Sequence, residues 1–118
     1  MVNGAAKLKS KSFALRVVKL YQHLSDKKKE YILSKQILRS GTSIGANLAE
    51  AECAISKNDF VSKVYIALKE CVETQYWLDL LKDSGYITQK EYESIFADCN
   101  ELTKILTKTT KTIKPREK

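Results

Sequence analysis

The sequence predicts an all-α protein, an antiparallel four-helix bundle of up-down-up-down topology. Apolar residues recur with a helical period in four blocks. Glycine and proline are scarce, with four Gly and one Pro in 118 residues, which disfavours a many-turned β fold. The connections between blocks are short, so consecutive helices must be antiparallel neighbours. We therefore predict one domain over residues 1–118, with basic tails at about residues 1–11 and 112–118.

The first half of the chain predicts two helices. The first has Ser10 or Ser12 as its N-cap and stops at Ser25. In the second, the apolar period runs unbroken from residue 33 to 55 through a glycine-containing stretch, where a loop would normally reset it. We therefore predict one long helix, bent near Gly41 and Gly45, whose small residues let a neighbouring helix approach closely.

The second half of the chain predicts two further helices with clear end signals. Ser56 followed by Asp59 is a weak capping box that opens the third helix, and Gly85 is the C-cap that ends it. Thr88 with Glu91 is a full capping box that opens the fourth helix.

The net charge of +7 is unevenly distributed along the chain. Residues 1–40 hold ten basic and two acidic residues (+8), residues 41–100 hold five and ten (−5), and residues 101–118 hold six and two (+4). In this topology the first helix begins and the last helix ends at the same end of the bundle, so both basic segments converge there. The candidate nucleic-acid-binding residues are Lys7, Lys9, Lys11, Arg16, Lys19, Lys104, Lys108 and Lys111.

Two interpretations of these basic residues stay open. A basic cluster of this kind is typical of proteins that bind the phosphate backbone of RNA or DNA. Alternatively, the lysines form a solubilising face with two frayed ends, because Lys is favoured near a helix C-terminus. Aromatic residues that could stack on bases are missing from both basic segments, which argues against a reader of single strands.

The sequence contains no recognisable catalytic or metal-binding constellation. A di-iron site needs two Glu-x-x-His motifs, and the only histidine is His23. Cys53, Cys71 and Cys99 are odd in number and widely spaced, unlike a disulfide framework or a zinc site. Residues 41–45, GTSIG, lack the consecutive Gly-Lys-Ser or Gly-Lys-Thr of a nucleotide-binding loop and do not follow a strand. We expect no enzymatic activity and no cofactor, and, without a membrane span or secretory signal, a cytoplasmic location and no membrane partner.

The third predicted helix has more apolar surface than one core needs. Such a wide apolar arc is usually buried on two sides, and Trp and Tyr are favoured interface anchors. We therefore predict a homo-oligomer, with a monomer that exposes aromatic residues as the alternative. Beside the core face, the additional stripe consists of Val61, Tyr65, Leu68, Val72 and Tyr76, and Trp77 lies elsewhere on the same helix.

Two segments resemble a known family. Residues 36–51, QILRSGTSIGANLAEA, and residues 56–81, SKNDFVSKVYIALKECVETQYWLDLL, are similar to the four-helix-bundle family named after 23S rRNA intervening-sequence proteins. The most specific part is the pattern Arg-Ser-x-x-Ser-Ile-x-Ala-Asn-x-x-Glu. It is formed here by Arg39, Ser40, Ser43, Ile44, Ala46, Asn47 and Glu50. Ala51 departs from the family, which usually has Gly at that position.

The resemblance implies a left-handed bundle, commonly assembled as a ring-shaped homopentamer. The family includes relatives of the accessory protein of diversity-generating retroelements, a basic pentamer that binds nucleic acid and a reverse transcriptase, but most members have no established activity. The candidate motif or subunit-interface residues are Arg39, Ser40, Ser43, Asn47, Glu50 and Trp77.

The leading expectation is therefore a homo-oligomeric bundle that binds RNA or DNA. The alternative is a protein-interaction scaffold of unknown partner with no nucleic-acid role. Whether Arg39, Asn47 and Glu50 serve function or only lock the second helix into its neighbours stays open, with the structural role favoured because buried polar groups are normally paired.

Overall fold

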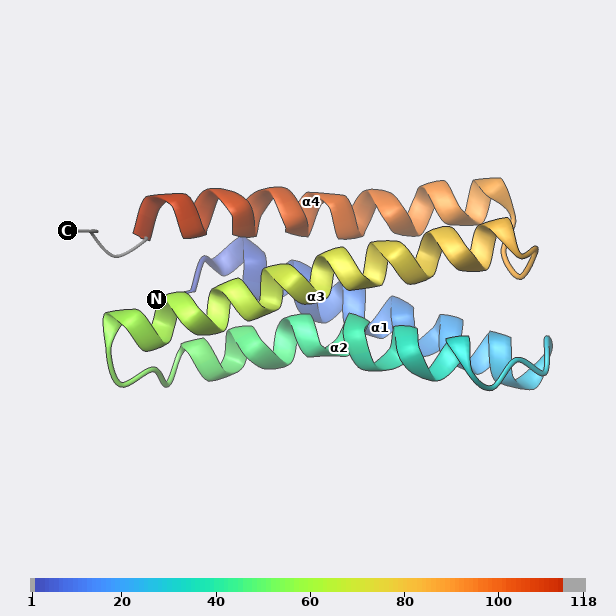
Figure 1. Cartoon of the computed structure of the whole chain (residues 1–118), viewed down its shortest axis with the longest axis horizontal. Helices are drawn as coiled ribbons and strands as arrows, with labels where there is room; N and C mark the ends of the chain where they lie inside the picture. The colour runs from blue at the N-terminus through green and yellow to red at the C-terminus, as the bar shows by residue number, and fades with distance from the viewer. Residues whose placement is uncertain (1, 114–118) are drawn as a thin grey trace.

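The computed structural model describes residues 2–113, which form four helices. They are α1 (Gly4–Asp26), α2 (Leu33–Ala51), α3 (Lys57–Asp83) and α4 (Gln89–Ile113). Each helix packs on the next, α4 returns to α1, and the diagonal pairs make no close backbone contact. The bundle is a rod of 50 × 23 × 22 Å, and the beginning of α1 and the end of α4 lie at the same end of it (Figure 1). The predicted four-helix bundle is confirmed.

The core is one column of side chains drawn from all four helices. Most of the apolar positions predicted from the helical period are buried in it. The exceptions include Ile55, which is exposed beyond the end of the second helix, and the half-buried Leu20, Leu33, Phe60 and Tyr92. Each fully buried aliphatic or aromatic side chain contributes about 1.5–3 kcal/mol to folding. The largest fully buried apolar side chains are Phe13, Val17, Leu24, Ile37, Ile44, Leu48, Val64, Leu78, Leu81, Leu102 and Leu106.

The first helix begins earlier than the sequence predicted. Asn3 is its N-cap, and Asn3 Oδ1 accepts hydrogen bonds from the backbone N–H groups of Ala5 (2.7 Å) and Ala6 (3.2 Å). The expected cap at Ser10 or Ser12 and the expected tail over residues 1–11 are therefore wrong. The reason is tertiary, because Ala6 and Ser10 are buried inside the bundle. The predicted tail at 112–118 lies outside the described residues, apart from residues 112 and 113, which continue α4.

The second helix runs unbroken through both glycines, as predicted, but ends at Ala51 instead of Ile55. A Cβ added to Gly41 would lie 2.8 Å from Val17 Cγ2, so only glycine lets α1 approach α2 this closely. At Gly45 the nearest atom would be Ser10 Oγ, at 3.4 Å. The glycine pair therefore determines how closely α1 and α2 pack.

The start of α2 is capped by Glu30, a signal that the sequence analysis missed. Glu30 Oε1 accepts a hydrogen bond from Ser34 N (2.7 Å), and Oε2 accepts from Leu33 N (3.0 Å) and Ile32 N (3.2 Å). Ser34 Oγ donates in return to Glu30 O at 2.8 Å. Burial alone would raise the pKa of Glu30, but these hydrogen bonds stabilise the carboxylate and hold its pKa below the ordinary value.

The ends of α3 and α4 follow the predicted signals. Ser56 Oγ accepts a hydrogen bond from Asp59 N (3.0 Å) at the start of α3, and Gly85 has a φ of +87° just after the helix. Thr88 and Glu91 bond each other reciprocally at the start of α4, at 3.1 and 2.8 Å. Over residues 2–113, no helix is both long and apolar enough to cross a membrane.

Candidate nucleic-acid interface

The start of α1 and the end of α4 bring exposed lysines to the same end of the bundle (Figure 1). On α4, Lys104, Lys108 and Lys111 follow one another at helical spacing on the face opposite the buried Leu102 and Leu106. Within residues 2–113, none of these three lysines has a carboxylate within 4 Å. The same is true of Lys11 on α1.

Two of the predicted α1 lysines are paired within the chain. Lys7 Nζ lies 3.5 Å from Glu52 Oε2, at the end of α2. Lys9 Nζ lies 3.1 Å from Glu101 Oε2, on α4. Both lysines are exposed to solvent, so each pair adds little stability. They nevertheless neutralise part of the positive charge that the sequence placed at this end.

Arg16 is held by α4. Its guanidinium donates to Asp98 Oδ2 (2.8 Å), to the backbone oxygen of Ser94 (3.3 Å) and to Ser94 Oγ (3.1 Å). Lys19 and His23 line a groove of about 690 Å³ between α1 and the beginning of α4. The eight basic residues predicted to bind nucleic acid are thus not brought onto one surface, since Lys19 lies toward the other end of the bundle.

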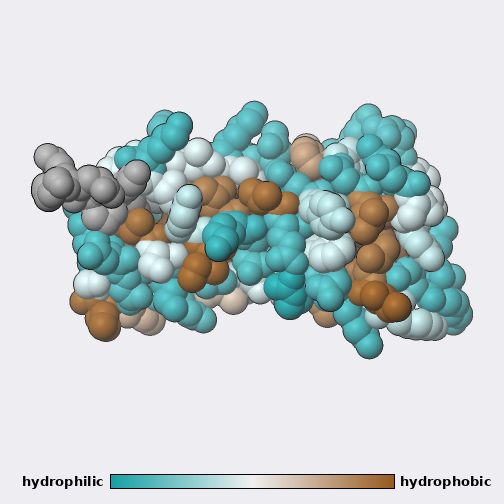
Figure 2. Space-filling model, in the orientation of Figure 1, coloured by the Kyte–Doolittle hydropathy of each residue, from teal (hydrophilic) through white to brown (hydrophobic). Residues whose placement is uncertain are grey.

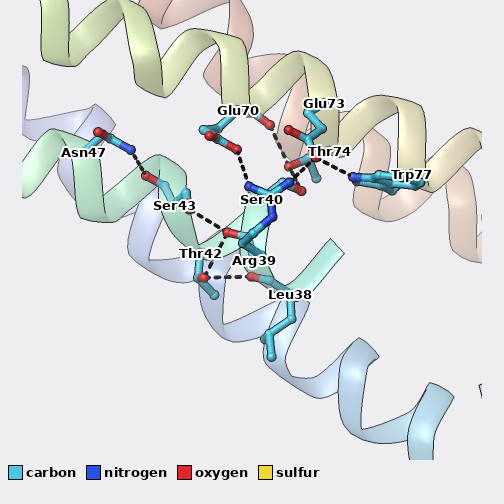
Figure 3. Close-up of polar contacts among 10 residues, drawn as sticks. All are labelled: Leu38, Arg39, Ser40, Thr42, Ser43, Asn47, Glu70, Glu73, Thr74 and Trp77. Atoms are coloured by element: carbon cyan, nitrogen blue, oxygen red, sulfur yellow. Dashed lines mark hydrogen bonds and ion pairs between the residues drawn. The ribbon is translucent and has the colours of Figure 1, made fainter. Parts of the chain in front are cut away.

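The family-like motif of α2 reaches across to α3 (Figure 3). Arg39 forms ion pairs with Glu73 and with Glu70, whose Oε1 lies 3.5 Å from Arg39 Nη1. Trp77 Nε1 donates to Glu73 Oε2 at 2.9 Å. Trp77, a predicted subunit-interface residue, is half-buried and packs against the core of its own chain.

A buried hydroxyl pair lies beside this ion-pair network. The side chains of Ser40 and Thr74 are fully buried, and their hydroxyl oxygens are hydrogen-bonded at 2.9 Å. Thr74 Oγ1 also donates to the backbone oxygen of Glu70 at 2.7 Å. These bonds satisfy polar atoms that burial would otherwise leave unpaired.

The remaining motif residues make local or exposed contacts. Ser43 Oγ donates to Arg39 O (2.7 Å) and Asn47 Nδ2 donates to Ser43 O (2.9 Å), both within α2. Glu50 pairs with Lys63 of α3 at 3.1 Å. Within one chain, the contacts of the motif therefore favour a structural role, in which Arg39, Ser40 and Glu50 join α2 to α3.

The additional apolar stripe of α3 faces away from the core. Tyr65, Val72 and Tyr76 are 56%, 54% and 58% exposed, whereas Val61 and Leu68 are half-buried. In the orientation in which α3 lies in front, Figure 2 shows hydrophobic groups in brown along the middle of this face, separated by hydrophilic ones.

The structure places an aromatic residue, Tyr65, beside the basic end of the bundle. The sequence had assigned Tyr65 only to the additional apolar stripe. Tyr65 lines a groove between α3 and α4, of about 390 Å³, together with Lys111. Because Tyr65 lies on a different helix from the basic segments, no local pattern could connect it with them. The other lining residues are Val61, Leu68, Thr107 and Thr110.

Two of the three free cysteines are buried, whereas Cys53 is exposed. No group of three or more His, Cys, Asp or Glu residues within 2–113 could hold a metal ion. Cys71 and Cys99 are buried between α3 and α4, and the interaction with Cys71, together with burial, raises the pKa of the Cys99 thiol. The thiol of Cys99 is therefore a protonated core group, and Cys71 is buried beside it.

Comparison with known proteins identifies the family. The family model described as 23S rRNA-intervening sequence protein matches residues 5–108. The chain belongs to this family. A crystal structure of a family relative, a protein with unknown function from the S23 ribosomal protein family of Bacteroides thetaiotaomicron VPI-5482, is 54% identical with a TM-score of 0.90. The match covers 91% of this chain and 96% of that one. No curated protein matches the chain.

Proposed function

We propose that the chain is a non-enzymatic nucleic-acid-binding bundle. The observation that carries this proposal is the exposed stripe of Lys104, Lys108 and Lys111, which have no carboxylate within 4 Å in the described part of the chain. Phosphate groups of RNA or DNA supply the missing counter-charge without requiring a particular sequence. Membership of a family named after 23S rRNA intervening sequences supports the same class of ligand.

The phosphate-binding surface is narrower than the set predicted from the sequence. It consists of the three α4 lysines, with Lys11 on α1. Arg16 is left out of this surface because its guanidinium already donates hydrogen bonds to Asp98 and Ser94 of α4. Lys7 and Lys9 contribute less to phosphate binding because each has a carboxylate partner.

Charge reversal of the α4 stripe tests this proposal. Changing Lys104, Lys108 and Lys111 to Glu should weaken binding to unrelated sequences about equally. It should also flatten the slope of log affinity against log salt by about 3, because each lost phosphate contact releases one counterion fewer. Fluorescence anisotropy with labelled RNA and DNA, over a series of salt concentrations, measures both effects.

A matched control reverses three exposed lysines at the opposite end, Lys27, Lys28 and Lys90. Both triple variants lower the net charge by six, from +7 to +1, so general electrostatic attraction changes equally. The control variant should keep most of the affinity. Equal losses in the two variants, or full affinity in the α4 variant, would show that the α4 stripe is not the binding surface.

We also propose that copies of this chain associate through the second half of the outer face of α3. The observation that favours this surface is the exposure of Val72 and Tyr76, which is costly for apolar side chains on a monomer when they lie side by side. The number of subunits remains the expectation of a pentamer, which rests on family resemblance.

A further inference from the structure

We propose that Tyr65 is a stacking platform for an unpaired base, so that the basic end of the bundle binds single-stranded nucleic acid. The inference rests on the proposed phosphate contacts of the α4 lysines and adds a base-binding position beside them. It also reverses the expectation from the sequence, in which no aromatic residue stood near the basic segments.

Tyr65 lines two hollows on the surface of the bundle. One is the α3–α4 groove, which it lines with Lys111, and the other is a hollow of about 380 Å³, which it lines with Lys69 and Val72. Tyr65 is 56% exposed, so a planar ligand can reach the ring without any movement of the core. Hollows of about 300 Å³ or more are large enough for small-molecule ligands.

The α4 side of the groove supplies polar groups beside the ring. Within the described residues, Thr107 Oγ1 makes no hydrogen bond, and Thr110 Oγ1 donates to Thr107 O at 2.9 Å, which leaves its lone pairs available. Lys111 is exposed at the rim. An aromatic face, hydroxyl groups and a cation in one groove fit a base together with its phosphate.

The charges around the groove favour a nucleic-acid strand over an apolar or basic partner. Lys69 and Lys111 line the two hollows, and Lys108 lies one turn before Lys111 on the outer face of α4. The one carboxylate among the lining residues, Glu73, is already bound by Arg39 and Trp77. A duplex cannot use the ring in this way because its bases are already stacked and paired.

The test compares Tyr65→Ala with Tyr65→Phe in the full chain. Anisotropy is measured with a labelled oligo-uridine and with a duplex RNA of equal length. Tyr65→Ala should weaken single-strand binding by about 5- to 150-fold, the range expected for loss of one stacked base, and leave duplex binding unchanged. Tyr65→Phe should keep the affinity, since the ring remains. Tyr31→Ala, at a loop position of similar exposure (53%), is the matched control and should have no effect.

The possible failures are distinguishable. If the wild type binds neither probe, the proposed function fails and this inference fails with it. If the wild type binds both probes and Tyr65→Ala binds oligo-uridine as tightly as the wild type, the stacking role is wrong while the phosphate contacts stand. Light scattering on the same samples reveals the third case, because a lower mass for Tyr65→Ala would make Tyr65 a subunit contact and overturn the inference.

Discussion

Gly41 and the residues next to it show how side-chain size determines packing in this bundle. Gly41 faces Val17 of α1, and its neighbour Ser40 faces Thr74 of α3, so consecutive positions of α2 contact two different helices. One contact requires the absence of a side chain, and the other requires a small hydroxyl. Larger side chains at either position would push neighbouring helices apart.

Gly41→Ala should therefore destabilise the protein although alanine is the better helix former. The added Cβ would lie 2.8 and 2.9 Å from the two methyl carbons of Val17, which is buried and cannot move aside. Overpacking costs about 1–3 kcal/mol, whereas the higher helix propensity of Ala returns about 1 kcal/mol. We expect a net loss of about 1 kcal/mol in the free energy of unfolding, measured by urea denaturation followed by circular dichroism.

Gly45→Ala is the control for this substitution. Its Cβ would lie 3.4 Å from Ser10 Oγ, an ordinary contact, so the gain in helix propensity should leave stability unchanged or raise it by up to about 1 kcal/mol. If Gly41→Ala is as stable as Gly45→Ala, the close approach of α1 and α2 does not depend on Gly41.

At the scale of the helix, the backbone N–H groups at the four helix N-termini find their hydrogen-bond acceptors in different ways. Asn3, Ser56 and Thr88 cap α1, α3 and α4 from the residue just before each helix. The corresponding residue of α2, Ile32, has no polar side chain, and Glu30 replaces it from within the loop. The beginning of α2 therefore depends on one buried carboxylate.

Glu30→Gln should lower stability at neutral pH by about 1–2 kcal/mol, because the amide loses the charge and one of the two acceptor oxygens. The folded-state pKa of Glu30 lies below its ordinary value of 4.5, so its stabilisation is fully present above about pH 4.5. It is lost as pH falls through the lower, folded-state pKa. Urea denaturation at pH 7 and at pH 3 should show a stability difference between wild type and Glu30→Gln that narrows in acid.

Glu93→Gln is the control for the cap. Glu93 is exposed and accepts a bond only from Gln89 of the same helix among the described residues, so its replacement should change stability little at either pH. A Glu30→Gln difference that stays constant between pH 7 and pH 3 would contradict the role of the ionised carboxylate.

At the scale of the whole molecule, the proposed phosphate-binding lysines and the proposed subunit contact lie at different positions along the bundle. The proposed phosphate-binding lysines, Lys11, Lys104, Lys108 and Lys111, lie toward the end where α1 begins and α4 ends, and the exposed side chains Val72 and Tyr76 lie farther along α3. Tyr65 and Tyr76 are about 16 Å apart along the helix axis, at 1.5 Å per residue. Nucleic-acid binding in the α3–α4 groove and self-association through Val72 and Tyr76 can therefore use neighbouring parts of α3, and Val72, which also lines the second hollow beside Tyr65, marks where the two parts meet.

A double variant, Val72→Glu with Tyr76→Glu, should reduce the mass of the protein in solution, because carboxylates cannot be buried in an apolar contact between subunits. Size-exclusion chromatography with light scattering measures the mass, and circular dichroism checks that helicity is retained. Substitution of Gly41 or Trp77 would be a poor test, since both pack inside the single chain.

Leu15→Glu is the matched control for this experiment. Leu15 is 57% exposed on α1, as apolar as Val72 but on another helix. The Leu15→Glu variant should leave the mass of the assembly in solution unchanged. A wild-type mass of one subunit, or equal effects at α1 and α3, would show that the outer face of α3 is not the contact between subunits.

The sequence alone determined the number of helices, most of their ends and the identity of the core. The signals for these features are local, since a helical apolar period and a capping side chain act within a few residues. Thr88 with Glu91, and Gly85 after α3, could be read directly for this reason. The cap at Glu30 could not, because it lies outside the usual capping position.

Only the tertiary structure decided which charged residues are available and which aromatic residue lies beside them. Whether Lys9 meets Glu101, or Tyr65 meets Lys111, depends on the rotation and axial offset of two helices that are far apart in the sequence. The early start of α1 has the same origin, because its first turns gain stability by packing Ala6 into the core. These features follow from the packing of all four helices together, which no local pattern encodes.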